Sequence, residues 1–315
     1  MEAALTPSRS NALAAALALA LLAPAPAPGG ELPAKPADLV AKLRARVEAV
    51  DSRLDGVLGV YVRDLETGAT IELRADETFP TASSIKLAVL YEVYRQADEG
   101  RIDLSEPTRP PAARVGGGGV LQELGDRVTL TWRDLVVLMM GWSDNEATNV
   151  LVRRVGLEAV NRRLDGLGLP RTRLRRLMMD VEAARLGAEN VSTPRELARL
   201  AEIVARGEGL APARATDALA AARVPDQGSP FRRGLPEGTR AVSKPGALEG
   251  VRCEAAFVDL PGRPYSAAVM TAYLQREKDG EDAIATISAA LYETFERLAR
   301  ASEHGRLIGE RVTTK

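Results

Sequence analysis

The residues best suited to covalent chemistry are a serine and a lysine three positions apart, Ser83 and Lys86, in the stretch Phe79–Tyr94. Apolar residues recur there at helical spacing, which predicts a helix that starts near the serine. The two Cβ atoms then lie about 5–6 Å apart on one face. The positive end of the helix dipole would favour an attacking alkoxide and an oxyanion. A buried lysine beside other cations would be neutral enough to take the serine proton.

A lone S-x-x-K pattern recurs by chance, and in most proteins its serine only caps a helix while its lysine reaches water. Two further segments change that balance. Ser143-Asp144-Asn145 follows a predicted helix, and Lys244-Pro245-Gly246 follows a predicted strand. They add a second hydroxyl, an amide and a second ammonium group. Three such elements in order are far more specific than any one of them.

The predicted elements suggest how these segments meet. Strand patterns lie near both ends of the chain and helical patterns fill its middle, so we expect an α/β (α+β) fold. One antiparallel sheet built from both chain ends would be flanked by helices and carry an inserted all-helical lobe. A cleft between the lobes would hold the site. The expected terminal elements are a helix at Ala37–Leu54, strands at Gly56–Asp64, Ala69–Leu73, Arg240–Ser243, Val251–Asp259 and Tyr265–Tyr273, and a helix at Gly280–Ala301.

We expect a single catalytic domain over residues 37–302, with a sheet lobe (37–80 and 215–302), a helical lobe (81–214) and a tail at 303–315. In the helical lobe, Thr131–Asp134 and Thr193–Glu196 have the spacing of capping boxes. The run Ser105–Gly119 is rich in proline and ends in four glycines. We expect it to form a flexible surface loop without packing of its own.

The first residues have the pattern of an export signal. Arg9 precedes the apolar run Asn11–Leu22, and small residues alternating with prolines follow. The run is too short to span a bilayer comfortably, so we interpret residues 1–28 as a signal peptide and 29–36 as a linker. The protein would be periplasmic or secreted, although a retained anchor stays open. The single cysteine, Cys253, excludes an intramolecular disulfide and is most simply a core residue.

Composition argues against several other functions. The chain is 45% hydrophobic and 27% charged with a formal net charge of -1, so neither nucleic acid nor an anionic membrane is an expected partner. The only histidine, His304, lies near the C-terminus, outside any packed pattern, which disfavours a Ser-His-Asp triad. Without metal-ligand spacing, we expect no metal and no cofactor. The expected partner is a small-molecule substrate bound by a monomer.

Together the motifs indicate a family. The first two match the S-x-x-K and S-D-N elements, and Lys244-Pro245-Gly246 differs by one residue from K-T-G. From about Ala37 to Ala301 the chain resembles the class A β-lactamases, serine hydrolases with a fold like that of penicillin-binding proteins. The segments Thr131–Val155 and Thr172–Arg176 add to the likeness.

The resemblance implies a role for each matching residue. Ser83 would be the acylated nucleophile and Lys86 its general base. Ser143 would give a proton to the leaving nitrogen, while Asn145 would hold the substrate amide and Lys86. Lys244 would attract the substrate carboxylate.

Two further positions complete the implied site. Backbone N–H groups of Ser83 and Ala247 would form the oxyanion hole. Arg252 is a candidate second anchor for a substrate carboxylate, and it could equally be an ordinary strand arginine.

Two departures from the family pattern concern substrate and water. Pro245 replaces a hydroxyl residue, which removes one hydrogen bond to a substrate carboxylate. The family's deacylating glutamate, two residues after the arginine of T-R-L-x-R, is here Met178, or Leu177 when counted back from Thr193. Glu182 could supply the missing base, with Asp180 a weaker candidate. Alternatively, both are solvated loop carboxylates.

The predicted function is therefore an exported serine hydrolase that acylates Ser83 with a β-lactam or a related amide and hydrolyses the product slowly, with antibiotic resistance as a possible role. One alternative is a relative of the peptidoglycan D,D-peptidases, for which slow release of penicillin is no defect. A second alternative is a non-catalytic binding module on the same fold. The retained Ser83, Lys86, Ser143 and Asn145 argue against it.

Overall fold

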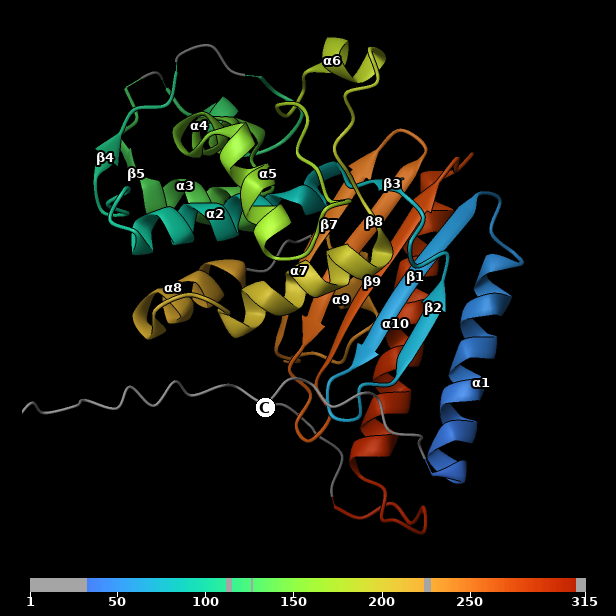
Figure 1. Ribbon diagram of the computed structural model, residues 1–315. Coiled ribbons are helices and arrows are strands. Elements are labelled where there is room, and N and C mark those ends of the chain that lie inside the picture. The colour runs from blue at the N-terminus through green and yellow to red at the C-terminus, as the bar shows by residue number, and fades with distance from the viewer. Residues whose placement is uncertain (1–32, 112–114, 126, 224–227, 310–315) are drawn as a thin grey trace, which may run out of the picture.

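The computed structural model describes residues 33–111, 115–125, 127–223 and 228–309. Its centre is a five-stranded antiparallel sheet with the strand order β2-β1-β9-β8-β7 (Figure 1). The two chain ends meet where β1 pairs with β9, with Val60 opposite Val269. The predicted sheet from both chain ends is confirmed. Its strands are β1 (Val57–Asp64), β2 (Thr70–Leu73), β7 (Ala241–Leu248), β8 (Val251–Val258) and β9 (Tyr265–Ala272).

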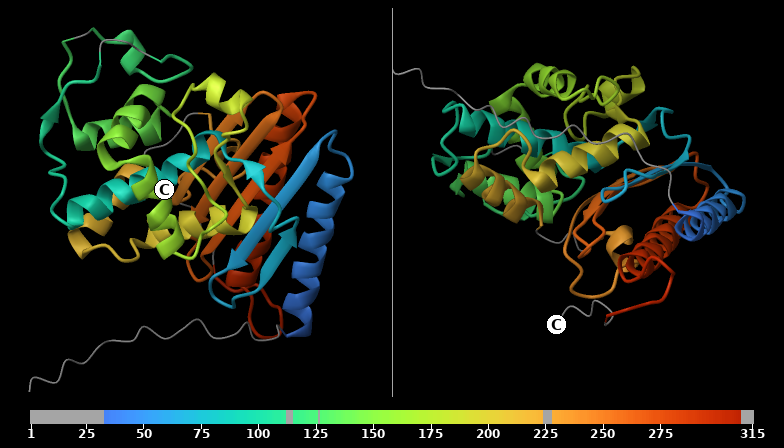
Figure 2. Two further views of the ribbon diagram at one scale, coloured as in Figure 1. Left: turned by 45° about the horizontal axis from the view of Figure 1, so that its top comes forward. Right: turned by 60° about the horizontal axis from the view of Figure 1, so that its bottom comes forward.

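Helices cover both faces of the sheet. On one face, α1 (Ala34–Asp51) and α10 (Glu277–Ala299) pack side by side and bury Leu43, Val47 and Leu291 in a shared core (Figure 2). On the other face, α7 (Pro194–Arg206) contacts β8 and β9 and joins the sheet to the helical lobe. The apolar stripe of each helix therefore faces the sheet, as burial of apolar area requires.

The helical lobe is built around α2 (Lys86–Asp98), most of whose residues are buried. Helices α4, α5, α7 and α8 pack around it, with α3 beside α4 and α8. The helix predicted after Ser83 is confirmed, but its first turn is a separate 3₁₀ helix, η1 (Ala82–Ile85). The surrounding helices are α3 (Trp132–Gly141), α4 (Asn145–Val155), α5 (Leu157–Gly166) and α8 (Pro212–Ala222).

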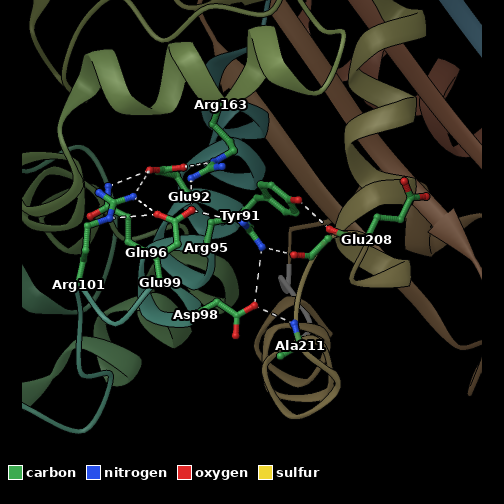
Figure 3. Close-up of polar contacts among 11 residues, drawn as sticks. Tyr91, Glu92, Arg95, Gln96, Asp98, Glu99, Arg101, Arg163, Glu208 and Ala211 are labelled. Atoms are coloured by element: carbon green, nitrogen blue, oxygen red, sulfur yellow. Dashed lines mark hydrogen bonds and ion pairs between the residues drawn. The ribbon is translucent and has the colours of Figure 1, made fainter. Parts of the chain in front are cut away.

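A network of charged groups holds α2 in this position (Figure 3). The Glu92 side chain is 1% exposed and accepts a 2.8 Å hydrogen bond from Arg163 of α5 and another from Gln96. Tyr91 donates to the backbone oxygen of Glu208, between α7 and α8. The buried carboxylate is thus paired, as a charge inside a helical lobe must be.

Of the two predicted capping boxes, one forms in full and the other only in part. The capping box at Thr131 forms in full. At the second predicted box, Thr193 accepts from the N–H of Glu196, but the Glu196 carboxylate accepts from the N–H groups of Arg171 and Thr172 instead of returning to the cap. Helix α8 was not predicted, and it packs on α2 and α3. The helical lobe therefore continues beyond the expected limit at residue 214.

The remaining elements are short. They are β3 (Phe79–Pro80), β4 (Pro107–Thr108), η2 (Leu121–Glu123), β5 (Leu130–Thr131), α6 (Val181–Arg185), β6 (Val191–Ser192) and α9 (Pro230–Arg233). Across the residues the structure covers, no helix is both long and apolar enough to cross a membrane. The predicted signal peptide lies outside the described residues.

Candidate active site

The turn that carries Ser83 is fastened to the sheet. The Ser84 hydroxyl donates a 2.8 Å hydrogen bond to the backbone oxygen of Lys244 in β7. The Cys253 thiol of β8 contacts the backbone oxygen of Thr81 at 3.0 Å. Gly246 has no room for a side chain, because a Cβ there would lie 2.5 Å from the oxygen of Thr81. The glycine of the third motif thus lets β7 approach the turn of the first.

Lys86 joins the first motif to the second. Its side chain is fully buried, and Nζ donates to the backbone oxygen of Ser143 at 2.6 Å, to Ser143 Oγ at 3.1 Å and to Asn145 Oδ1 at 3.0 Å. Ser143 has a positive φ of 51°, which is uncommon for a residue other than glycine. In this conformation both the backbone oxygen and Oγ of Ser143 lie within hydrogen-bond distance of Lys86 Nζ. A proton can therefore pass between Lys86 and the Ser143 hydroxyl without movement of either backbone.

Asp144, the middle residue of the second motif, has a structural role that the sequence did not reveal. Its buried carboxylate caps α4 by accepting from the N–H of Ala147, and it also accepts from the N–H groups of Val120 and Leu121 at 2.7 and 2.8 Å. A Cβ on Gly119 would lie 2.4 Å from the Asp144 Cγ. The glycine run therefore packs against the site at this end, where we expected a loop without packing.

These segments enclose one cavity of about 690 Å³. Ser83, Ser143 and Asn145 line it, with Pro245, Gly246 and Ala247 of β7 among the facing residues. The structure thus brings the three motifs together at one hollow. Lys244 is fully buried on the same strand, and its backbone is tied to Ser84, the neighbour of Ser83.

A loop between α5 and α7 forms another wall of the cavity. Asn149, one turn after Asn145 on α4, donates to the backbone oxygen of Met178 and accepts from its N–H. This pair of bonds holds Met178 in the lining of the cavity. Arg176 forms a 2.7 Å ion pair with Glu189 across the base of the loop. The sequence singled out Met178 but gave no reason to predict Asn149 as its anchor.

The two proposed replacement bases do not line the cavity. The Glu182 side chain is 75% exposed on α6 and has only a 3.9 Å ion pair to Arg185. Asp180 caps the same short helix by accepting from the N–H of Ala183. Their positions match the alternative in which both are solvated loop carboxylates. The carboxylates that do line the cavity are Glu189, paired with Arg176, and Glu249.

Arg252 also lies outside the cavity lining. Its guanidinium donates to the backbone oxygens of Leu248 and Val251 and to Glu281 of α10. Val251, the preceding residue, lines the cavity instead. Neighbouring residues of a strand point to opposite faces, so the register of β8 directs the valine to the cavity and the arginine to α10.

Two adjacent buried residues of β8 have altered acidity. Burial raises the pKa of Glu254 to about 7, although hydrogen bonds from Ser229 and from the N–H of Phe231 oppose the shift. Burial likewise raises the pKa of the Cys253 thiol to about 12. The cysteine is thus an unreactive core residue, as predicted. Over the described ranges, no His, Cys, Asp or Glu side chains group in a way that could hold a metal ion.

The residues at the cavity are suited to acyl transfer. A hydroxyl on a tight turn, a buried amine and a second hydroxyl are the groups that nucleophilic attack, proton removal and protonation of a leaving group require. Ser83 of η1 and Ala247 of β7, the two residues expected to form an oxyanion hole, both line this hollow.

Comparison with known proteins agrees with this chemistry. A family model described as the β-lactamase enzyme family matches residues 42–295. A β-lactamase of Streptomyces cellulosae is 32% identical over 252 residues, which are 77% of this chain and 79% of that protein. One from Streptomyces fradiae is 30% identical over 262 residues, 80% of this chain and 85% of that protein.

Solved structures include both β-lactamases and a penicillin-binding protein. The crystal structure of a β-lactamase from Sphaerobacter thermophilus has a TM-score of 0.73 and 33% identity, covering 81% of this chain and 97% of that one. PBP-A has a TM-score of 0.74 and 28% identity, with coverage of 82% and 97%. A mutant of PBP-A is also known as an acyl-enzyme complex with penicillin G.

Proposed function

Because this chain belongs to the β-lactamase enzyme family, we propose that it acylates Ser83 with a β-lactam or a related amide and then releases the acyl group slowly. The chain is a serine hydrolase of the β-lactamase type. The contact of Lys86 with Ser143 and Asn145, at the wall of the cavity that Ser83 lines, is the observation that carries the proposal. The alternative of a non-catalytic module is not retained.

Acylation follows from the positions of these groups. Ser83 Oγ attacks the carbonyl carbon while Lys86 takes its proton, and the negative oxygen lies between the N–H groups of Ser83 and Ala247. The Ser143 hydroxyl then gives its proton to the leaving nitrogen and is reprotonated by Lys86 across 3.1 Å. The products of this step are an acyl-Ser83 ester and a free amine, with no proton gained or lost overall.

Slow release follows from the wall that faces the ester. The position expected to carry the family's deacylating glutamate is Met178 or Leu177 by the two counts, and neither side chain can take a proton from water. Glu189 is paired with Arg176, Glu249 lies at the turn between β7 and β8, and Glu182 points to solvent. The acyl-enzyme therefore reacts with water without a positioned carboxylate base.

The same feature supports a second candidate, a relative of the peptidoglycan D,D-peptidases. Such an enzyme forms the same acyl-serine and has no need to hydrolyse penicillin quickly. The fold of PBP-A, which matches 82% of this chain, is consistent with it. For either enzyme we propose export, on the pattern of residues 1–28, into the periplasm or the medium.

Intact-protein mass spectrometry after mixing with penicillin G tests the proposal. We expect one adduct of the mass of penicillin on the wild type and none on Ser83→Ala. Decay of the adduct over minutes, with release of hydrolysed penicillin, would identify a slow β-lactamase, whereas a persistent adduct would favour the peptidase. Absence of any adduct, or an adduct on Ser83→Ala, would contradict an acyl-Ser83 mechanism.

A further inference from the structure

Several of the side chains that line the catalytic cavity are apolar and exposed. Trp142 at the end of α3 and Val181 at the start of α6 are each about half exposed, and Met179 is only slightly less so. Leu248, at the end of β7, closes the side nearest the sheet. Exposed apolar side chains gathered around a hollow are typical of sites that bind an apolar group.

The position of Met179 in this rim follows from its backbone conformation and from the contact of its side chain with Gly117. It has a positive φ of 62°, which is unfavourable for a side chain of this size. A Cβ built on Gly117 would lie 2.3 Å from the Met179 sulfur, so the thioether reaches across to the glycine run. The neighbouring Met178 is fixed through its backbone by Asn149. The apolar wall is thus a built part of the cavity.

The charged groups that line the cavity are poorly placed to bind a substrate carboxylate, and Lys244, expected to attract one, is fully buried and does not line the cavity. Arg176 is already paired with Glu189. Glu249, at the turn between β7 and β8, would repel a carboxylate. On β7, Pro245 offers neither a hydroxyl nor an N–H group. Val251 lines the cavity, whereas the guanidinium of the neighbouring Arg252 is bonded on the side of α10.

We propose that this site selects acyl donors with an apolar acyl group and does not require a carboxylate, so that its substrates include neutral esters as well as amides. This inference rests on the proposed acylation of Ser83. In the ester reaction, the bond from Ser83 Oγ to the acyl carbon forms as the ester C–O bond breaks. The alcohol leaves with the serine proton, and water later cleaves the acyl-serine to a carboxylic acid and free Ser83.

Chain-length dependence provides the test. The rate of Ser83 acylation by p-nitrophenyl acetate, butyrate and hexanoate is measured from the initial burst of p-nitrophenolate, relative to the uncatalysed hydrolysis of each ester. We expect acylation to rise about tenfold or more from acetate to hexanoate, because each buried methylene adds to the binding free energy. A six-carbon acyl chain that ends in a carboxylate should react more slowly than hexanoate.

Two variants and one control test whether the rim residues cause the preference for longer acyl chains. Val181→Asp should reduce the ratio of hexanoate to acetate rates by about fivefold or more, because it places a charge where an acyl chain would lie. Met179→Gly, which suits the positive φ, should reduce it as well. Leu186→Asp is the matched control, since Leu186 is 79% exposed at the end of the same short helix and does not line the cavity. It should keep the wild-type ratio.

The outcomes separate the two proposals. If mass spectrometry shows Ser83 acylated equally well by all esters, or if Val181→Asp keeps the wild-type ratio, the apolar specificity is wrong while the acyl-serine mechanism stands. If neither penicillin nor any ester acylates Ser83, both proposals fail.

Discussion

Counted forward from Arg176, Met178 is the position at which we expect the family's deacylating glutamate, and its neighbours hold this part of the loop. The Asn149 side chain donates to the backbone oxygen of Met178 and accepts from its N–H, so this position is held whatever side chain residue 178 carries. The side chain itself is buried in the cavity lining. A substitution here should therefore change the chemistry without displacing the loop.

We predict that Met178→Glu speeds decay of the penicillin adduct by at least about tenfold, because a positioned general base typically contributes 10² or more. Burial would keep the new carboxyl a competent base near neutral pH. The measurement is the loss of adduct mass with time. Glu182→Gln is the control and should leave the decay unchanged, since Glu182 is exposed to solvent. An unchanged rate in Met178→Glu would disprove our account of slow release.

Cys253 provides a second prediction at this scale. Burial raises the pKa of its thiol to about 12, so almost no thiolate exists near pH 8. Iodoacetamide at that pH should leave the folded protein unlabelled over an hour and label it fully in urea, as mass spectrometry would show. Labelling of the folded protein at the rate of a free thiol would mean that β8 opens far more readily than its burial indicates.

Among the elements, α2 matters most, because its first residue is Lys86 and the turn before it carries Ser83. Its apolar residues pack against the surrounding helices, and its one deeply buried carboxylate, Glu92, is paired with Arg163. Removing Glu92 takes from Arg163 the buried one of its two carboxylate partners.

We predict that Glu92→Ala lowers the free energy of unfolding by about 3 kcal/mol or more, measured by urea denaturation. Glu99→Ala is the matched control. Glu99, the C-cap residue of α2, also pairs with Arg163, but its side chain is partly exposed, so its loss should cost less than about 1 kcal/mol. Equal losses in the two variants would show that burial of Glu92 does not decide the effect.

At the scale of the whole molecule, the central sheet joins the two chain ends. One of its strands, β8, carries a fully buried carboxyl group, Glu254. Burial raises the pKa of Glu254 from an ordinary value of 4.5 to about 7. The folded state therefore holds this proton more strongly than the unfolded state. The stabilisation is fully present below pH 4.5 and is lost as the pH rises through about 7.

The expected loss between pH 4.5 and 7.5 is about 3 kcal/mol, at 1.36 kcal/mol for each pKa unit. Glu254→Gln removes this titration. As the pH rises, the wild type should lose unfolding free energy relative to the variant. Urea denaturation at pH 5, 6, 7 and 8 measures it. A difference that is constant with pH would contradict a raised pKa at Glu254.

The fold could be predicted from the sequence because its signals are local. Strand patterns in the terminal segments indicated the strands of the sheet, and the capping box at Thr131 indicated where α3 begins. The second box failed in part because Glu196 found stronger partners in the backbone at Arg171 and Thr172, contacts that join segments far apart in the chain. The roles assigned to Ser83, Lys86, Ser143, Asn145, Lys244 and Ala247 stay predictions.

The types and spacing of the residues were enough to indicate an antiparallel sheet, a helical lobe and a serine acylated beside a lysine, since short motifs contain that information within a few positions. The folded molecule was needed to show that Arg252 turns from the cavity, that Glu182 faces solvent and that Met179 reaches the glycine run. Strand register and loop packing direct each side chain, and both result from contacts between residues distant in sequence.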